Sequence, residues 1–343
     1  MSTTEELVRS GRRARQLRWA GSTLALGVVV VALVGVSLTL GDPAYSLGEV
    51  WAVATGDDAG GAEFIVGELR MPRVAMATVA GVAFGLSGAT FQTILRNPLA
   101  SPDVVGITAG ASAAAAIGII SMGWTDTRVS VMAVLAGLGV AAVVYLLSWR
   151  GGLHGTRLVL IGIGAAAMLQ SVVAIQLEKA QRAQLAEALR WLTGTLNGAT
   201  WASVVLPAAA VVVLGTVLLA NAREISIGQL GDDAATALGV RVERSRMLAI
   251  LSAVMLICIA TAATGPIAFV AFLAGPIAAR VVGPNGSVLL PAALTGAALV
   301  LGADWVGQNL TPFRYPVGVV TGVLGAPYLL YLIIRTNRTG GSL

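Results

Sequence analysis

Reactive side chains are scarce in this chain of 343 residues. It contains one cysteine, Cys258, and one histidine, His154. A single cysteine excludes an internal disulfide bond, and a single histidine falls short of the roughly three or four ligands that a metal site needs. The only lysine, Lys179, follows Glu178 and not a glycine, which excludes a Gly-Lys-Ser/Thr phosphate loop. We therefore predict no catalytic residue, no metal site and no cofactor in this chain.

Charge is also scarce, because charged residues make up only 11% of the chain and hydrophobic residues 56%, with a mean hydropathy of +0.84. Soluble domains carry about 25% charged residues. The apolar runs are roughly 17–23 residues long and do not alternate with polar residues, which favours membrane-spanning helices over barrel strands. The 42 glycines fit helices that pack through small residues. The composition therefore predicts a membrane protein with many spans.

We predict ten spanning helices. Their approximate ranges are 19–40, 73–95, 104–123, 128–148, 158–177, 201–221, 247–264, 266–281, 288–308 and 317–335. An even number puts both termini on one side, and the positive-inside rule makes this side the cytosol because most of the arginines fall there. Residues 1–18 then form a basic cytosolic tail, 19–335 the membrane domain and 336–343 a second cytosolic tail. Orientation explains the net charge of +5 better than nucleic acid does.

Short helices are expected outside the lipid. Ser46 and Glu49 have the spacing of a helix capping box in the first outer loop. A second amphipathic helix is expected between Glu178 and Thr200. On the cytosolic side, the loop 222–246 contains a predicted helix from Asp232 to Leu238, because aspartate favours the first helical turn and the glycine that follows suits a helix end.

The stretch from Arg70 to Gly110 organises the chain. Arg70 and Arg73 stand just before one end of an apolar span, and a tight loop with Arg96-Asn97-Pro98 follows its other end. Between them, Gly81, Gly85 and Gly88 have the spacing of a close helix contact. These features indicate the wall of a conduit and not a chemical site.

One acidic residue, Asp304, falls inside a predicted span. A charge at a span centre costs about 2.5–3.5 kcal/mol on insertion scales. Asp304 is therefore either an ion-coupling group or a carboxylate near the outer helix end that bonds its neighbours. The other spans have almost no ionisable residues, so the energy for transport is expected from a partner chain.

These motifs resemble the FecCD-type permeases, the membrane subunits of ABC importers for ferric siderophores, haem and vitamin B12. The resemblance runs roughly from residue 41 to 335 and rests on Arg70-Met71-Pro72-Arg73, Ser87-Gly88, Gln92, Arg96-Asn97-Pro98-Leu99-Ala100-Ser101-Pro102, Gly265-Pro266 and Pro316-Val317-Gly318. It implies an all-α membrane protein with the BtuC-like permease fold of type II ABC importers. It also implies a permease for ferric siderophores in the cytoplasmic membrane, with haem and vitamin B12 as alternatives.

The resemblance implies partners as well. They are a second permease subunit, two ATP-binding subunits that hold ATP and magnesium, and an extracytoplasmic siderophore-binding protein, with iron present only as chelated substrate. The matching site residues are Arg70 and Arg73 for docking of the binding protein; Gly231, Asp232, Asp233, Leu238 and Gly239 for coupling to the ATPase; Gly155 and Thr156 for an inner gate; and Arg96, Asn97 and Pro98 for the cytosolic family loop.

The sequence departs from the family pattern at two places. Gly275-Pro276 stands where the family often has Pro-His, and Gln308 stands where it often has an arginine. Arg314 is a candidate to replace that docking arginine. The Gly-Pro variant resembles the ferric-enterobactin G-type permeases, which pair with a related second permease, so a heterodimer is expected and a homodimer stays open.

Two other classes of function are alternatives to the importer permease. A proton- or sodium-coupled transporter would use Asp304 as its coupling group. An intramembrane enzyme would need paired acids, a histidine cluster or a Ser/Lys dyad, and the spans contain none of these. The importer permease is our prediction, although the sequence does not identify the chelate.

Overall fold

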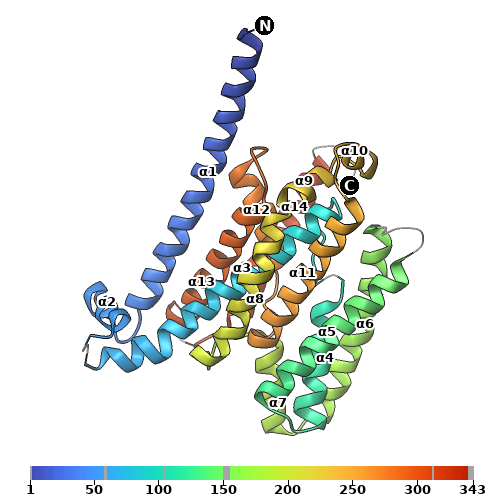
Figure 1. Ribbon diagram of the computed structural model, residues 1–343. Helices are drawn as coiled ribbons and strands as arrows, with labels where there is room; N and C mark the ends of the chain where they lie inside the picture. The colour runs from blue at the N-terminus through green and yellow to red at the C-terminus, as the bar shows by residue number, and fades with distance from the viewer. Residues whose placement is uncertain (1, 58–59, 104, 150–154, 311–312, 339–343) are drawn as a thin grey trace.

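A computed structural model describes residues 2–57, 60–103, 105–149, 155–310 and 313–338. The elements in chain order are α1 (Ser2–Thr39), α2 (Leu47–Thr55), η1 (Glu63–Arg70), α3 (Met71–Ile94), α4 (Ile107–Ala116), η2 (Ile117–Ser121), α5 (Asp126–Ser148), α6 (Gly155–Lys179), α7 (Arg182–Leu192), α8 (Trp201–Ala220), α9 (Ala222–Gly228), α10 (Asp232–Ala237), α11 (Val242–Thr264), α12 (Val270–Val282), α13 (Leu289–Asn309) and α14 (Val317–Arg338). All of these are helices (Figure 1). His154 and residues 339–343 of the predicted C-terminal tail lie outside the described residues.

The predicted spans correspond to helices. Among the described residues, seven helices are long and apolar enough to cross a membrane, and three shorter apolar helices are Ile107–Ser121, Val270–Val282 and Val317–Tyr331. Each predicted range overlaps one of these helices. The short eighth span, expected at 266–281, is α12, and its boundaries shift by a few residues.

One helix begins earlier than the predicted span. The second span was predicted from residue 73, whereas the π-helical segment η1 continues directly into α3 and forms one helical run from Glu63 to Ile94, which includes Arg70 and Arg73. Pro72 has no N–H to donate, so it would interrupt a regular α-helix here. The wider π turn before it accommodates the proline without ending the helix.

Helix α3 is the centre of the bundle, and it packs against α8, α11, α12 and α13. In the most apolar window of its helical run, 78% of the residues are buried. The predicted glycine contacts are confirmed. A Cβ at Gly81 would lie 2.5 Å from the Cα of Ala297 on α13, and a Cβ at Gly88 would overlap the carbonyl oxygen of Ala271 on α12.

Helix α1 extends well beyond the bundle (Figure 1). Its 38 residues span about 57 Å at about 1.5 Å per residue, roughly twice the thickness of a bilayer core. Only 11% of its apolar window is buried. The basic segment that precedes the first predicted span is therefore the first half of this helix.

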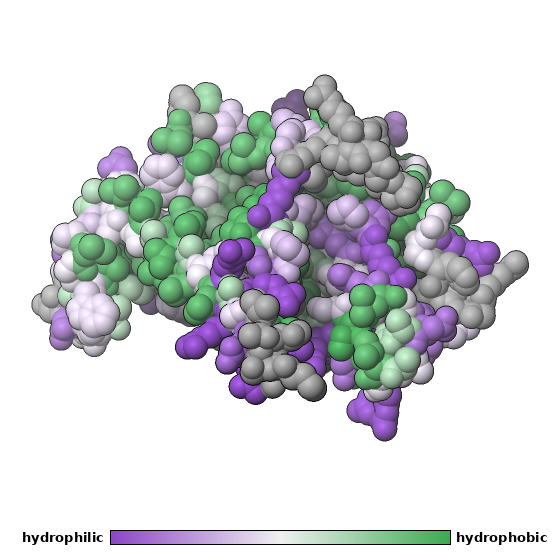
Figure 2. Space-filling model, turned by 90° about the horizontal axis from the view of Figure 1, so that it is seen from above, coloured by the Kyte–Doolittle hydropathy of each residue, from purple (hydrophilic) through white to green (hydrophobic). Residues whose placement is uncertain are grey.

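We name the two ends of the bundle by the short helices that lie there (Figure 1). The α7 end also carries α2, and the α10 end also carries α9. The predicted capping box of α2 is confirmed, since the Glu49 N–H donates to Ser46 Oγ and the Ser46 N–H donates to the Glu49 carboxylate. Figure 2 looks onto the α10 end, where hydrophilic residues gather in the middle and right of the view.

Candidate functional site

Three arginines expected to contact a binding protein line one hollow at the α7 end. The hollow has a volume of about 320 Å³ and is open to solvent. Arg70 and Arg73 come from the helical run of α3, and Arg314 comes from the segment before α14. Asp42 and Asp304 line the same hollow, so it combines three cations with two anions. The fold thus brings together residues that lie more than 200 positions apart in the sequence.

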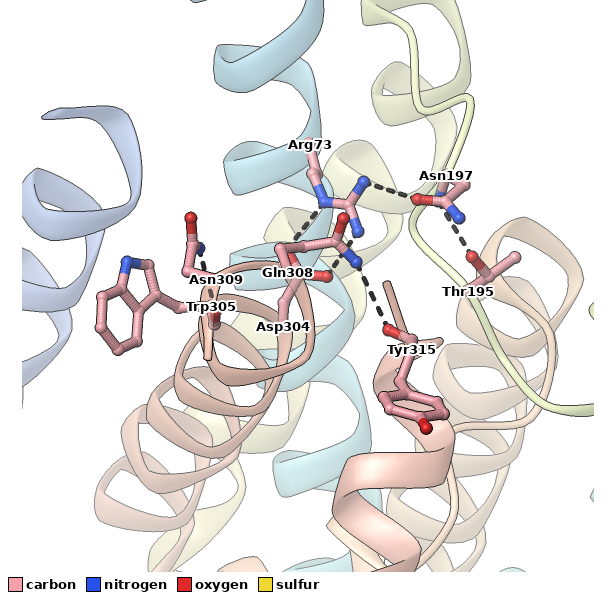
Figure 3. Close-up of polar contacts among 8 residues, drawn as sticks. All are labelled: Arg73, Thr195, Asn197, Asp304, Trp305, Gln308, Asn309 and Tyr315. Carbon is pink, nitrogen blue, oxygen red and sulfur yellow. Dashed lines mark hydrogen bonds and ion pairs between the residues drawn. The ribbon is translucent and has the colours of Figure 1, made fainter. Parts of the chain in front are cut away.

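Arg73 is the centre of a polar cluster in this hollow (Figure 3). Its guanidinium donates from Nε to Asp304 Oδ2 at 2.8 Å and from Nη2 to Asp304 Oδ1 at 2.7 Å. A third donor, Nη1, reaches Asn197 Oδ1 at 2.6 Å. A bidentate pair of this kind is among the stronger hydrogen-bonded contacts in proteins. The pair joins α3 to α13, and the contact with Asn197 adds the segment between α7 and α8.

Asp304 is buried, with 8% of the residue exposed. Of the two interpretations of Asp304, the structure favours a carboxylate near a helix end that bonds its neighbours. Both carboxylate oxygens accept hydrogen bonds from the Arg73 guanidinium. Asp304 therefore has a structural contact between α13 and α3.

Arg70 holds the connection that follows α1. Its guanidinium donates to the carbonyl oxygens of Leu38 at 3.0 Å and Pro43 at 2.6 Å, and it lies 5.3 Å from the centre of the Tyr45 ring. A cation over an aromatic face gains about 0.5–1 kcal/mol at an exposed site. The Arg70 side chain therefore fixes the loop between α1 and α2.

Gln308 and Arg314 occupy the region that departs from the family pattern. The Gln308 amide donates to the carbonyl oxygen of Tyr315 at 3.3 Å, and the Tyr315 N–H donates to the carbonyl oxygen of Gly307 at 3.0 Å (Figure 3). Gln308 thus helps to close the short connection between α13 and α14. Arg314 on this connection is exposed, and it forms no ion pair with the residues that the structure describes.

At the α10 end, the predicted helix in the loop 222–246 is present as α10, from Asp232 to Ala237. It lies between Gly231 and Gly239, which both have positive φ, at 110° and 85°. Leu230 and Leu238 flank the helix and are 66% and 62% exposed. Two exposed leucines beside a short polar helix form an apolar surface that a soluble partner can cover.

The family loop lies beside α10. Arg96 donates to the carbonyl oxygen of Gly228 at 2.7 Å and to the Asp232 carboxylate at 3.2 Å. The Asn97 side chain accepts a hydrogen bond from the Leu99 N–H at 2.8 Å, which forms the tight turn at Pro98.

The predicted gate residues Gly155 and Thr156 begin α6. Gly155 packs against Leu95, and it lines a hollow together with Arg96 and Asp232. Thr156 is exposed. The structure therefore brings the predicted gate, the family loop and the predicted coupling helix together at one end of α3.

The connection between α3 and α4 contains a carboxyl group that the sequence analysis passed over. Asp103 keeps part of its surface exposed, but protein atoms surround its carboxyl group. This desolvation raises the pKa of Asp103 from 3.8 to about 6, and a hydrogen bond with Thr108 opposes part of the shift. The sequence signal was available, because Asp103 directly follows the Ser101-Pro102 motif.

Two further positions were missed because their importance depends on distant partners. Asn197 shares Arg73 with Asp304, and Arg246 on α11 donates to the Asp232 carboxylate at 2.8 Å. Neither position carries a motif of its own. Only the packing of the chain shows which charged group each side chain faces.

A bundle of apolar helices with a charged hollow at each end is the architecture of a polytopic membrane transport protein. The chain belongs to the FecCD transport family, whose model matches residues 28–335. It is 43% identical over 294 residues to the ferric enterobactin transport system permease protein FepG of Escherichia coli K12, a match that covers 84% of this chain and 88% of FepG.

Two other comparisons agree with this family. The chain is 37% identical over 337 residues to the achromobactin transport system permease protein CbrC of Dickeya dadantii, with 96% of each chain covered. Its fold matches that of a metal-chelate type ABC transporter in an inward-facing conformation, with a TM-score of 0.80 over 91% of this chain and 98% of the other. The sequence identity to that structure is 24%, so the likeness concerns the fold.

Proposed function

We propose that this chain is the membrane-spanning permease subunit of an ATP-driven importer that carries ferric siderophores into the cytoplasm. The observation that carries the proposal is the 43% identity to a ferric enterobactin permease over 84% of the chain. A second relative, at 37% identity, is by its name an achromobactin permease. Haem and vitamin B12 remain the alternative cargoes within the same family.

The two ends of the bundle have different tasks in this proposal. The α7 end faces the outside and receives the siderophore-binding protein at the hollow lined by Arg70, Arg73 and Arg314. The α10 end faces the cytoplasm, where α10 and its flanking leucines contact an ATPase subunit. Both chain termini are then cytosolic. The basic first half of α1 supports this orientation, because arginines concentrate on the cytoplasmic side of membrane proteins.

ATP hydrolysis belongs to the partner subunits, and the iron travels as a chelate that this chain does not ligate. The permease supplies the wall of a passage between two permease subunits, with Gly155 and Thr156 at its inner gate. Small and weakly polar side chains suit this task, since conduction requires contacts that do not trap the cargo. ATP-driven movement of α10 would open and close the passage.

A comparison of uptake tests the proposed function. Cells with and without this gene would receive iron-55 bound to several siderophores, and in parallel labelled haem and vitamin B12. We expect loss of uptake for ferric siderophores alone. Loss of haem or vitamin B12 uptake instead would reassign the cargo, and unchanged uptake of all of these would contradict the importer.

Arg314 offers the cleanest test of docking by the binding protein. Substitution of Arg70 or Arg73 by glutamate would also break the internal contacts of these side chains, whereas Arg314 is exposed. Exposed charges act mainly on the association rate. We expect Arg314→Glu to slow association about two- to tenfold in surface plasmon resonance, more at low salt than at high salt. Arg128→Glu, at an exposed arginine on α5, is the matched control, and equal effects of both variants would remove the docking role.

Contact with the ATPase should depend on the apolar flanks of α10. Leu238→Asp places a charge on the exposed apolar surface beside the helix. We expect this variant to lose most of the ATPase on affinity purification in detergent, as deletion of Gly231–Gly239 also would. Leu47→Asp on α2, at a leucine that is also well exposed but lies at the opposite end, should retain the ATPase. Full retention in the Leu238 variant would contradict the assigned contact.

The pairing of the permease can be tested separately. Co-expression of a tagged and an untagged copy, with and without the neighbouring permease gene, would show which partner co-purifies. We expect a heterodimer with a related permease. Recovery of both copies of this chain in one complex would favour the homodimer.

A further inference from the structure

The contacts of Asp232 link the proposed coupling helix to the helix at the centre of the bundle. Asp232 is the first residue of α10, and its Oδ1 atom accepts hydrogen bonds from two arginines. Arg96 follows α3 and donates at 3.2 Å, and Arg246 on α11 donates at 2.8 Å. Arg96 also donates to the carbonyl oxygen of Gly228 at the end of α9. One carboxylate oxygen therefore joins α3, α10 and α11.

Arg96 lies in the turn that ends α3, which fixes where its side chain begins. Its φ is +51°, a left-handed conformation that costs a residue with a side chain on the order of 1 kcal/mol or more. The turn holds this conformation through the Arg96 N–H, which donates to the Thr93 carbonyl at 3.3 Å, and the Asn97 N–H, which donates to the Gln92 carbonyl at 3.1 Å. From this fixed turn the Arg96 side chain reaches the Gly228 carbonyl and the Asp232 carboxylate.

The predicted gate lies directly beside this junction. Arg96, Asp232 and Arg246 line one hollow together with Gly155 and Leu95. A Cβ at Gly155 would lie 3.3 Å from the Leu95 side chain, so the start of α6 is packed onto the end of α3. A shift of α10 would therefore move Arg96. Arg96 directly follows Leu95, and Leu95 contacts Gly155 at the start of α6.

We propose that Asp232 is a positioning residue that transmits the movement of α10 to α3 and the start of α6 through Arg96 and Arg246. The use of this link in transport rests on the proposed function, but the link itself does not. The Arg96–Asp232 pair is half exposed, with 45% and 53% of the two side chains accessible, and 22% of the Arg246 side chain is accessible. Pairs of this kind add little to overall stability, but they bias the position of one short helix.

Hydrogen–deuterium exchange on the purified full-length chain, without an ATPase, tests the link itself. We expect amides of α10 to exchange about two- to fivefold faster in Asp232→Asn, Arg96→Gln and Arg246→Gln than in the parent protein, the change that loss of exposed ion pairs allows. Glu243→Gln, which removes an exposed carboxylate from the first turn of α11, is the control and should not change α10. Unchanged exchange in the two arginine variants would overturn the link, because Asp232 would then act only on its own helix end.

Transport per ATP hydrolysed, measured in proteoliposomes with the complete importer, tests the use of the link. We expect each of the three variants to lower this ratio about two- to fivefold while the ATPase stays bound, and the double variant Asp232→Asn/Arg96→Gln to be no worse than either single variant. Additive losses, or an unchanged ratio, would overturn the transmission role. If the protein transports nothing with an ATPase, the proposed function fails, whereas the exchange result on the isolated chain still decides the link.

Discussion

Gly88→Ala is expected to abolish most of the folded protein. A Cβ at Gly88 would overlap the backbone carbonyl of Ala271 on α12, and a backbone atom cannot move aside as the end of a flexible side chain can. Helices α3 and α12 would have to separate along a face where both are buried. Overpacking in a close-packed core usually costs about 1–3 kcal/mol, and this contact lies at the upper end because two backbones meet. Fluorescence-detected gel filtration in detergent would show the loss as a reduced monodisperse peak.

Two other glycines provide matched controls for this variant. Gly139 on α5 and Gly164 on α6 are also inside helices, but an added Cβ would meet nothing within 4 Å at either position. Alanine is favoured over glycine in a helix by about 1 kcal/mol. Gly139→Ala and Gly164→Ala should therefore leave the peak unchanged or raise it. A normal peak for Gly88→Ala would show that the bundle is packed less tightly along α3 than the structure has it.

Asp304→Ala is expected to have the second largest effect. It removes both carboxylate oxygens that accept hydrogen bonds from Arg73, and it leaves an arginine with only 20% of its side chain exposed. Loss of one member of a buried ion pair costs about 3–5 kcal/mol, and the partial exposure of this pair puts the expected value at about 3 kcal/mol. The melting temperature of the purified protein should fall by several degrees, and uptake should fall with it because less protein is folded.

A second variant separates the cost of an unpaired charge from the value of the pair. In Arg73→Met/Asp304→Leu both charges are absent, so no guanidinium is left without its partner, and we expect much of the lost melting temperature to return. Asp42→Asn, an exposed aspartate in the same hollow, should change it little. If instead Asp304→Asn kept its stability and its ATP hydrolysis but lost uptake, Asp304 would be an ion-coupling group after all.

Local patterns predicted the helices well. Run length and composition were sufficient for ten apolar helices, since the backbone in lipid must satisfy its own hydrogen bonds. The Ser46/Glu49 cap and the aspartate and glycine signals around α10 were also readable, because capping chemistry depends on residues a few positions apart. The boundary at Arg70 was missed, since a proline normally marks a helix start and the π turn that accommodates Pro72 leaves no clear sign in the sequence.

The sequence by itself determined that this protein is a bundle of membrane helices, that Gly81 and Gly88 make close contacts, and that a short helix follows Gly231. These properties depend on composition and on spacings within one segment. Only the tertiary structure decided that Arg73 pairs with Asp304 and that Asp232 forms ion pairs with both Arg96 and Arg246. The partners lie on different helices, and a sequence records the charge of a side chain but not which distant charge it will face.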